Sequence, residues 1–407
     1  MKSIVIDPLK KERKGNRYIR RCILTRWDGN KKVRSDELFF SFPVTVNPPD
    51  DNDCDAYLLA TVMDAMSENR TITVKGSVSA ELLVNIREFQ GCWKLWLPGE
   101  FNEIGIEADA IREGEKQNPH VMCAFSGGVD ATFSVWRHNM KQPAEGAYQI
   151  THASFIHGLD IPLSEPAIFA SACQSIEGTL QEAGIDLVCM ATNYRQISQL
   201  RWIYAHGAAM VACLSNLKTL AGKCLIASSR SYNELIFPWG SNPVSDPLLS
   251  SAGFRIIHDG ATHSRLDKIK AISGWQTATR NLRVCWENQD KEGNCGKCEK
   301  CLRTKIMFLL NHQPVPRCFP DWQEEIAVKD VTLATEHHRQ DWKDLHRLAR
   351  QNGFDKKTLS QIAQATRKKQ PWKDLLMPRG TATRELAVKL KTYFLRKKSG
   401  LNGLQHT

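Results

Sequence analysis

The chain has 407 residues, of which 42% are hydrophobic and 24% are charged. This length accommodates two or three domains, and the composition excludes a disordered or fibrous protein. The apolar stretches, such as residues 207–214, are shorter than the roughly 20 residues that a helix needs to cross a bilayer, and the first residues lack the apolar core of a signal peptide. We therefore expect a cytoplasmic protein without a membrane partner.

The formal net charge of +11 is concentrated at the two ends of the chain. Residues 355–407 contain 13 Lys and Arg against 3 Asp and Glu, and residues 1–36 contain 12 against 4, which leaves −7 for the middle. Basic ends can bind nucleic acid or an acidic partner, or they can serve solubility alone. The sequence leaves both interpretations open.

From about residue 17 to residue 97, the sequence shows the alternation of apolar and polar side chains that is typical of strands. A helix is expected among them at 56–68, and the clearest strand patterns lie at 38–42, 71–74 and 92–96. We expect a small α+β domain over residues 1–115, followed by a polar linker at 112–119.

From residue 121 onward, short apolar runs alternate with longer helical segments. The runs predict strands at 121–125, 153–156, 187–191 and 225–228, and the segments between them predict helices at 130–140, 166–183 and 201–220. Alternating strands and helices are typical of βαβ units. The predicted fold class is therefore α/β, with a Rossmann-like parallel sheet covered by helices on both faces.

Beyond residue 301 the pattern becomes helical. The spacing of apolar residues predicts helices at 304–310, 340–352, 358–366 and 381–395. Residues 313–407 are thus expected to form a basic helical extension.

The strand that ends at Phe125 is followed by the loop Ser126-Gly127-Gly128-Val129-Asp130 and then by a helix. Such a loop gathers backbone N–H groups and a helix amino terminus around one concave site, a geometry that binds phosphate. The glycines permit close approach of the backbone, and Asp130 is placed to meet a magnesium ion on the phosphates. The alternatives are a glycine turn without a ligand and a loop that binds nucleotide without turning it over.

Thirteen cysteines occur along the chain, and in a cytosolic protein they favour thiols and a metal over disulfides. The spacing of metal ligands is found in Cys285, Cys295, Cys298 and Cys301. Four thiolates at this spacing can close a tetrahedral zinc site, and a site with four protein ligands is structural. An iron-sulfur cluster and a chance grouping of buried cysteines are the alternatives.

The loop lacks Gly-Lys-Ser/Thr and so differs from the loop of kinases and GTPases. It resembles the pyrophosphate loop of the N-type ATP pyrophosphatases, usually Ser-Gly-Gly-x-Asp-Ser. The resemblance implies a sheet of the adenine nucleotide hydrolase (PP-loop) type and cleavage of ATP between its α and β phosphates, with adenylation of a substrate carboxylate or carbonyl. Ala131 stands in place of the final serine, and Thr132 is the residue that could replace its hydroxyl.

Loop and cysteines together resemble 7-cyano-7-deazaguanine synthase, the QueC family, over residues 119–312. The agreement includes Leu266-Asp267-Lys268-Ile269 and Cys295-Gly296-Lys297-Cys298-Glu299-Lys300-Cys301. Members of the family adenylate the carboxylate of 7-carboxy-7-deazaguanine, let ammonia attack to give an amide, and activate it again to reach the nitrile. The resemblance implies ATP with Mg²⁺, a structural Zn²⁺ and a deazapurine acid as substrate.

The resemblance also implies roles for individual residues. The residues that would bind ATP lie in the glycine loop, in the first turn after it and at two neighbouring strand ends. They are Ser126, Gly127, Gly128, Val129, Asp130, Ala131, Thr132, Ile156, His157 and Ala191. The substrate pocket would contain Ser229, Arg230, Tyr232, Asn242 and Asp246. Catalysis would rest on Ser126 and Asp130 together with Arg230 and Lys268, which would stabilise charge as pyrophosphate leaves, although ordinary salt bridges are the alternative for these two cations. His157 and His206 are expected to pack or to form hydrogen bonds.

The chain departs from the synthase in three ways. Besides Ala131, residues 228–246 lack the Tyr-Pro-Asp-Cys-Arg signature of the nitrile synthases, and both ends of the chain are additional. This layout resembles the QueC-like enzymes of anti-phage operons such as type IV CBASS and Qat. That branch implies an ATP-dependent ligase that passes the activated acid to an amine of a partner protein from the same operon. Proximity then selects the amine.

Two alternatives to the ligase stay open. One is synthesis of 7-cyano-7-deazaguanine (preQ0) from ammonia. The other is a PP-loop enzyme that acts on RNA, since tRNA-modifying thiolases share the loop. Against RNA, the basic tail does not interleave aromatic with basic residues, and Cys123 lies in an apolar strand where packing is its expected role.

Overall fold

A computed structural model of the chain describes residues 2–141, 147–285, 293–320, 328, 331, 333 and 336–367. They belong to two compact units, Met1–Asn294 with Pro316–Pro320, and Cys295–Val315 with Asp321–Thr407. No helix within the described ranges is long and apolar enough to cross a membrane.

The amino-terminal part of the first unit begins with a three-stranded antiparallel meander of β1 (Lys2–Lys14), β2 (Arg17–Asp28) and β3 (Lys31–Pro43). Two glycines with positive φ, Gly15 and Gly29, form its turns. It continues through α1 (Asp55–Glu68), β4 (Thr71–Ser79), α2 (Ala80–Trp96) and β5 (Ile106–Arg112), and β4 lies parallel between β1 and β5. The expected helix at 56–68 and the strands at 38–42 and 71–74 are confirmed.

The expected strand at 92–96 is wrong, because these residues form the last turn of α2. In a strand, Trp93 and Leu95 would share a face, but Trp93 is fully buried while Leu95 is 82% exposed. The buried side chains of α2 are Leu82, Ile86, Phe89, Gln90 and Trp93, a spacing of three and four residues that belongs to a helix. A window of five residues is too short to show the helical spacing, which is visible only over the whole of residues 80–96.

The second part of this unit alternates strands and helices, as expected. Its parallel strands are β6 (Val121–Ala124), β7 (Ile150–His157), β8 (Asp186–Thr192), β9 (Lys223–Ala227) and β10 (Arg255–Asp259). The main helices between them are α3 (Val129–Val135), which continues as a π-helical turn at Trp136–Met140, then α4 (Pro166–Glu182) and α6 (Trp202–Leu214). Shorter helices are α5 (Tyr194–Ile197), α7 (Arg265–Ile272) and α8 (Gln276–Arg280).

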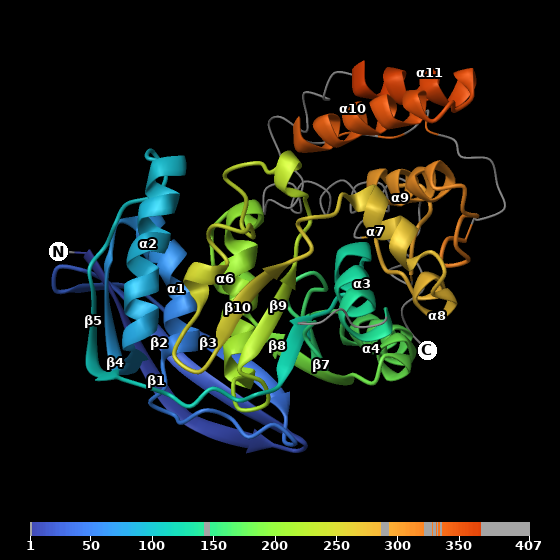
Figure 1. The fold of residues 1–407 in the computed structure, drawn as a ribbon. Coiled ribbons are helices and arrows are strands. Elements are labelled where there is room, and N and C mark those ends of the chain that lie inside the picture. The colour runs from blue at the N-terminus through green and yellow to red at the C-terminus, as the bar shows by residue number, and fades with distance from the viewer. Residues whose placement is uncertain are drawn as a thin grey trace, which may run out of the picture. The chain divides into compact units, whose positions relative to one another are not determined.

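All ten strands join in one mostly parallel sheet with the order β10-β9-β6-β7-β8-β3-β2-β1-β4-β5. The meander meets the parallel strands where β3 pairs antiparallel with β8, at Phe40↔Thr192 and Ser41↔Ala191. The fold of the unit is therefore α/β, with a sheet that runs from the amino-terminal strands into the alternating part (Figure 1).

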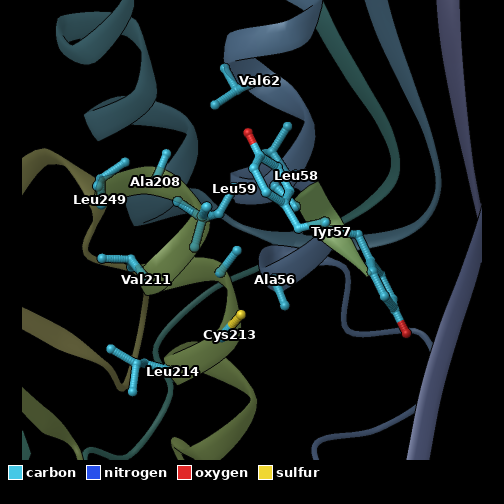
Figure 2. Packing of buried hydrophobic residues seen from close by; sticks show 14 of the residues in the cluster. Ala56, Tyr57, Leu58, Leu59, Val62, Ala208, Val211, Cys213, Leu214 and Leu249 are labelled. Atoms are coloured by element: carbon cyan, nitrogen blue, oxygen red, sulfur yellow. The ribbon is translucent and has the colours of Figure 1, made fainter. Parts of the chain in front are cut away.

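Hydrophobic residues are buried on both faces of the parallel strands. Met122, Ile156 and Ile226 belong to one cluster, whereas their neighbours Cys123, Phe155 and Leu225 belong to another. Side chains of α1 and α6 interlock in the first cluster, as Figure 2 shows. Residues of α3, α4 and α8 complete the second. This burial explains why these strands read as continuous apolar runs in the sequence.

The second unit is helical where it is described, with α9 (Glu299–Leu310), α10 (Glu336–Gln351) and α11 (Lys356–Arg367). The Trp342 indole donates to Glu299 Oε1 (3.0 Å), and Arg303 bridges Glu299 (2.8 Å) and Asp341 (2.7 Å), so polar contacts join α9 to α10. The expected helices at 304–310, 340–352 and 358–366 are confirmed. The one expected at 381–395 lies outside the described residues.

Candidate functional site

The strand order identifies the carboxyl ends of β6 and β9 as the place where a ligand would bind. From β6 the chain moves outward through β7 to β8, and it then returns to place β9 on the other side of β6. Ligands of open α/β sheets bind at such a switch point, outside the carboxyl ends of the strands. The loop Ser126–Asp130 follows β6, and the segment Ser228–Tyr232 follows β9, so both begin at this point.

The glycine loop is held in a conformation that only glycine adopts easily. Gly127 has φ +75°, and its carbonyl accepts a hydrogen bond from the Arg283 backbone N–H (2.8 Å). A Cβ atom on Gly127 would lie 2.8 Å from Ile176 Cγ2 of α4. Gly128 is the N-cap of α3 and has no side chain to bond the first N–H groups of the helix. The first N–H groups of α3 therefore have no partner from the side chain of the N-cap residue.

Two cations meet Asp130 on the first turn of α3. Arg265 Nη1 lies 2.8 Å from Asp130 Oδ2, and Lys268 Nζ lies 3.3 Å from Oδ1. Lys268 is 1% exposed and also donates to the carbonyl of Ser228. The lysine thus joins the loop after β6 to the loop after β9. Two cations beside one carboxylate leave a net positive charge, which suits a polyphosphate.

Helix α7 presents both cations from one face, because they are three residues apart. A capping box starts the helix: the Ser264 hydroxyl accepts from the Asp267 N–H (3.2 Å), and the Asp267 carboxylate accepts from the Ser264 N–H (3.0 Å). Local sequence therefore fixes where α7 begins, and so where its cations lie.

Asp259, the last residue of β10, supports the far end of α3. Its carboxylate accepts from Ser134 (2.6 Å) and Arg137 (3.1 Å), and lies 3.1 Å from His138 Nε2. Burial opposes ionisation of Asp259, but the contacts with His138 and Ser134 outweigh it and lower the pKa of this carboxyl. The anion ties β10 to the helix that carries the loop.

The other residues expected to bind ATP lie at neighbouring strand ends. Ile156 and His157 end β7, and His157 is paired with Ala191 of β8. The His157 ring stacks on Phe169 at 4.5 Å, its Nε2 lies 2.8 Å from the Pro162 carbonyl, and burial lowers its pKa. Within α3, the side chains of Val129, Ala131 and Thr132 are buried.

The residues expected in the substrate pocket fall into two groups. Ser229 and Tyr232 are exposed, and the Arg230 guanidinium lies 5.8 Å from the centre of the Trp239 ring. Asn242 and Asp246 are buried. Ser229 and Tyr232 are therefore accessible from solvent, whereas Arg230 is partly buried.

Asn242 and Asp246 hold the loop that they belong to. The Asn242 amide accepts from the backbone of Val244 and Ser245 and donates to the Trp239 carbonyl. Asp246 accepts from the Ser241 hydroxyl (2.7 Å) and the Asn242 backbone (3.1 Å), and lies 2.7 Å from His258 Nδ1. These contacts give both side chains a role within the protein.

Close backbone approach fixes this loop against α6. A Cβ atom on Gly207 would overlap the carbonyl oxygen of Gly240. The Gly240 N–H donates to the Ile203 carbonyl (2.9 Å), and His206 Nδ1 lies 3.0 Å from the Trp202 carbonyl, with its pKa lowered by burial. His206 is therefore a packing and hydrogen-bonding residue, as expected.

Sequence reasoning missed Arg265, Arg283 and Asp259. The capping box beginning at Ser264 is the signal that could have placed Arg265 on the same helical face as Lys268. Arg283 contacts the loop through its backbone, and its guanidinium lies 5.5 Å from the Phe155 ring centre. No sequence pattern marks a backbone contact of this kind.

The four cysteines with metal-ligand spacing come together. The sulfur atoms of Cys285, Cys295, Cys298 and Cys301 all lie within 4.8 Å of one another. Cys295 and Cys301 are 3.9 Å apart, close to the roughly 3.8 Å between sulfurs that Zn–S bonds of 2.3 Å give in a tetrahedron. The Cys298 N–H also points to the Cys295 sulfur (3.3 Å). This donor set fits a metal ion such as zinc.

Asn294 organises the segments that hold the first two of these cysteines. Its side-chain oxygen accepts from the backbone N–H groups of Val284 (2.9 Å) and Cys285 (3.0 Å), and its amide donates to Leu282 and Cys318 carbonyls. Glycines on either side of Cys295 adopt positive φ. Hydrogen bonds to the residues around a metal site help to hold its ligands in position.

A second group of possible ligands, Asp53, Asp55 and Glu115, has cations as partners. Lys218 lies 2.5 Å from Asp53 and 2.6 Å from Glu115, and Arg112 contacts all three carboxylates. These ion pairs account for the grouping without a metal.

Comparison with known proteins gives no match: no family model matches the chain, and neither a curated protein nor a solved structure is significantly similar to it.

Proposed function

We propose that this chain is an ATP-dependent ligase that adenylates a carboxylate and transfers the acyl group to an amine. The observation that carries the proposal is the cluster at the switch point, where Asp130 of the glycine loop meets Lys268 and Arg265. Following the resemblance in sequence, the acid is 7-carboxy-7-deazaguanine or a similar deazapurine. The amine belongs to a partner protein, and the setting is anti-phage defence.

The proposed reaction assigns separate tasks to the residues of the site. The N–H groups of the loop and the first turn of α3 bind the β and γ phosphates. Asp130 would hold Mg²⁺, which supplies charge neutralisation on the phosphates. A substrate carboxylate oxygen attacks the α phosphorus, and the bond to the leaving pyrophosphate breaks. Lys268 and Arg265 stabilise the charge of that leaving group.

The second half of the reaction forms the C–N bond. The amine attacks the acyl carbon, AMP leaves, and the amine loses a proton. Once the acyl-adenylate exists, the amine that is held nearest reacts. The exposed Tyr232 and the Arg230–Trp239 pair lie on the segment after β9, where the deazapurine would bind.

The test is pyrophosphate release that depends on the deazaguanine acid. Lys268→Met is expected to lower this rate by about 100-fold or more, since removal of one donor that stabilises charge in the transition state commonly slows a reaction by about that factor. Lys270→Met is the matched control, because Lys270 is exposed on the same helix and is expected to leave the rate unchanged. Ser126→Ala and Asp130→Ala are expected to abolish release. Unchanged release in these variants would refute the site.

The identity of the amine needs a separate measurement. With ATP, the acid and ammonia but without a protein partner, mass spectrometry should detect little free nitrile. Rapid nitrile formation would instead favour preQ0 synthesis. Binding to RNA that weakens steeply with salt, together with RNA-dependent pyrophosphate release, would favour the RNA-modifying alternative.

A further inference from the structure

Two cysteines outside the metal-ligand group lie in direct contact. The sulfur of Cys173, on α4, is 2.8 Å from the sulfur of Cys189, on β8. Both residues are only partly buried. Helix α4 packs against β8, which brings together two thiols that are 16 residues apart in the chain. The two sulfur atoms are therefore already in contact, and they need to approach by less than 1 Å to reach the roughly 2.05 Å of a disulfide bond.

The surroundings distinguish the two thiols. The hydrogen bond shared with Cys173 lowers the pKa of Cys189, and the positive charge of Arg17 acts in the same direction against the effect of burial. The same hydrogen bond raises the pKa of Cys173. Arg17 is fixed nearby, because its guanidinium donates to the carbonyls of Ser41 (2.8 Å) and Cys189 (3.1 Å). Because the Arg17 guanidinium is bound at the Cys189 main chain, we assign Cys189 as the nucleophile and Cys173 as the thiol that resolves it.

The position of Cys173 on α4 links this pair to the glycine loop. Phe169, Cys173 and Ile176 are spaced by four and three residues, so they lie on one face of the helix. Phe169 stacks on His157 at the end of β7, and Ile176 lies against Gly127. A disulfide bond at Cys173 would therefore restrain α4 at a position between its contact with His157 and its contact with Gly127.

We propose that Cys173 and Cys189 form a peroxide-responsive dithiol that closes into a disulfide between α4 and β8. The Cys189 thiolate attacks one oxygen of hydrogen peroxide, the O–O bond breaks, and water leaves after protonation to give a sulfenic acid. The Cys173 thiol then attacks that sulfur, the S–O bond breaks, and a second water leaves. Two thiols lose two electrons and two protons, and one peroxide becomes two waters.

The sequence makes the product easy to identify. No lysine or arginine occurs between Lys141 and Arg195, so trypsin leaves both cysteines in one peptide. Cleavage after Glu177 and Glu182 then separates them, unless a disulfide joins the fragments. Peroxide treatment of the zinc-loaded full chain, alkylation of the remaining thiols and this double digestion should give the linked pair, lighter by two hydrogens than the two reduced fragments.

Variants separate the roles of the two thiols. In the Cys173→Ser variant, oxidation should stop at a sulfenic acid on Cys189 that dimedone traps. Cys189→Ser should make Cys173 react at least 10-fold more slowly. Cys92→Ser is the control, because Cys92 is partly exposed on α2 and its loss should leave formation of the linked pair unchanged.

Three outcomes would overturn the proposal. The first is that peroxide treatment gives no linked peptide pair. The second is that Cys189 reacts with peroxide no faster than Cys92 does. The third is that Cys189 is oxidised to a sulfinic acid while Cys173 stays reduced. All of these readouts are independent of ATP turnover, so the result does not depend on the proposed ligase activity.

Discussion

Gly127→Ala tests whether the loop is built as tightly as the structure shows. The left-handed backbone at φ +75° costs an alanine about 1–2 kcal/mol. The new methyl group would also lie 2.8 Å from Ile176 Cγ2, and overpacking of this kind costs a further 1–3 kcal/mol or so. We therefore expect the free energy of unfolding to fall by roughly 2–5 kcal/mol, the sum of these two contributions.

Gly184→Ala is the matched control for the backbone contribution. Gly184 has φ +69°, but no heavy atom of the described chain lies within 4 Å of a Cβ built there. It should lose only about 1–2 kcal/mol. Urea denaturation of the full chain measures both losses, and Ile176→Ala should restore part of the loss at Gly127 in a double-mutant cycle. Equal losses of unfolding free energy at the two glycines, or no recovery on adding Ile176→Ala, would show that the loop is not tightly packed against α4.

The same structure gives further expectations. Burial raises the pKa of Asp64 to about 6, so this carboxyl stabilises the fold below its unfolded pKa of about 4, and the contribution is lost as pH rises through 6. Asp64→Asn, which can still accept from Ser198, should therefore raise the free energy of unfolding by up to about 3 kcal/mol at pH 7 and by little at pH 4, and an equal gain at both would contradict the assignment. Purified protein should contain one zinc per chain by elemental analysis, and Cys298→Ser should lose it while Cys318→Ser keeps it. Closing the disulfide between α4 and β8 should add about 3 kcal/mol to the free energy of unfolding, measured in urea with and without reductant.

Sequence patterns predicted most of the parallel strands and helices, because those elements are long or buried on both faces. They failed where the pattern was short. Residues 92–96 alternate like a strand although they end α2, and β10 contains only two adjacent apolar residues, Ile256 and Ile257, between charged or polar ones. Strand β1, whose last five residues are all exposed and charged, was also not expected.

The candidate site shows the same division. The glycine loop and the four cysteines are local patterns and were recognised directly. The contact of Asp130 with Arg265 joins residues that are 135 positions apart, so no local pattern contains it. Asn242 and Asp246 lie in a segment that was expected to line a pocket, and what the sequence could not indicate is that their polar atoms already bond within their own loop. Their contact with substrate stays a prediction.

Under the proposed function, the partners of Asp130 also determine how nucleotide and magnesium reach the site. The carboxylate contacts Arg265 and Lys268, and both cations are largely buried. If a metal ion binds the Asp130 oxygens, Arg265 and Lys268 lose their ion pairs with this carboxylate. That loss costs little free energy only when other anions pair with the two cations. The phosphates of ATP are such anions. Nucleotide and Mg²⁺ should therefore bind cooperatively, and in an Asp130→Asn variant ATP affinity should lose most of its dependence on Mg²⁺, because the exchange of partners no longer takes place.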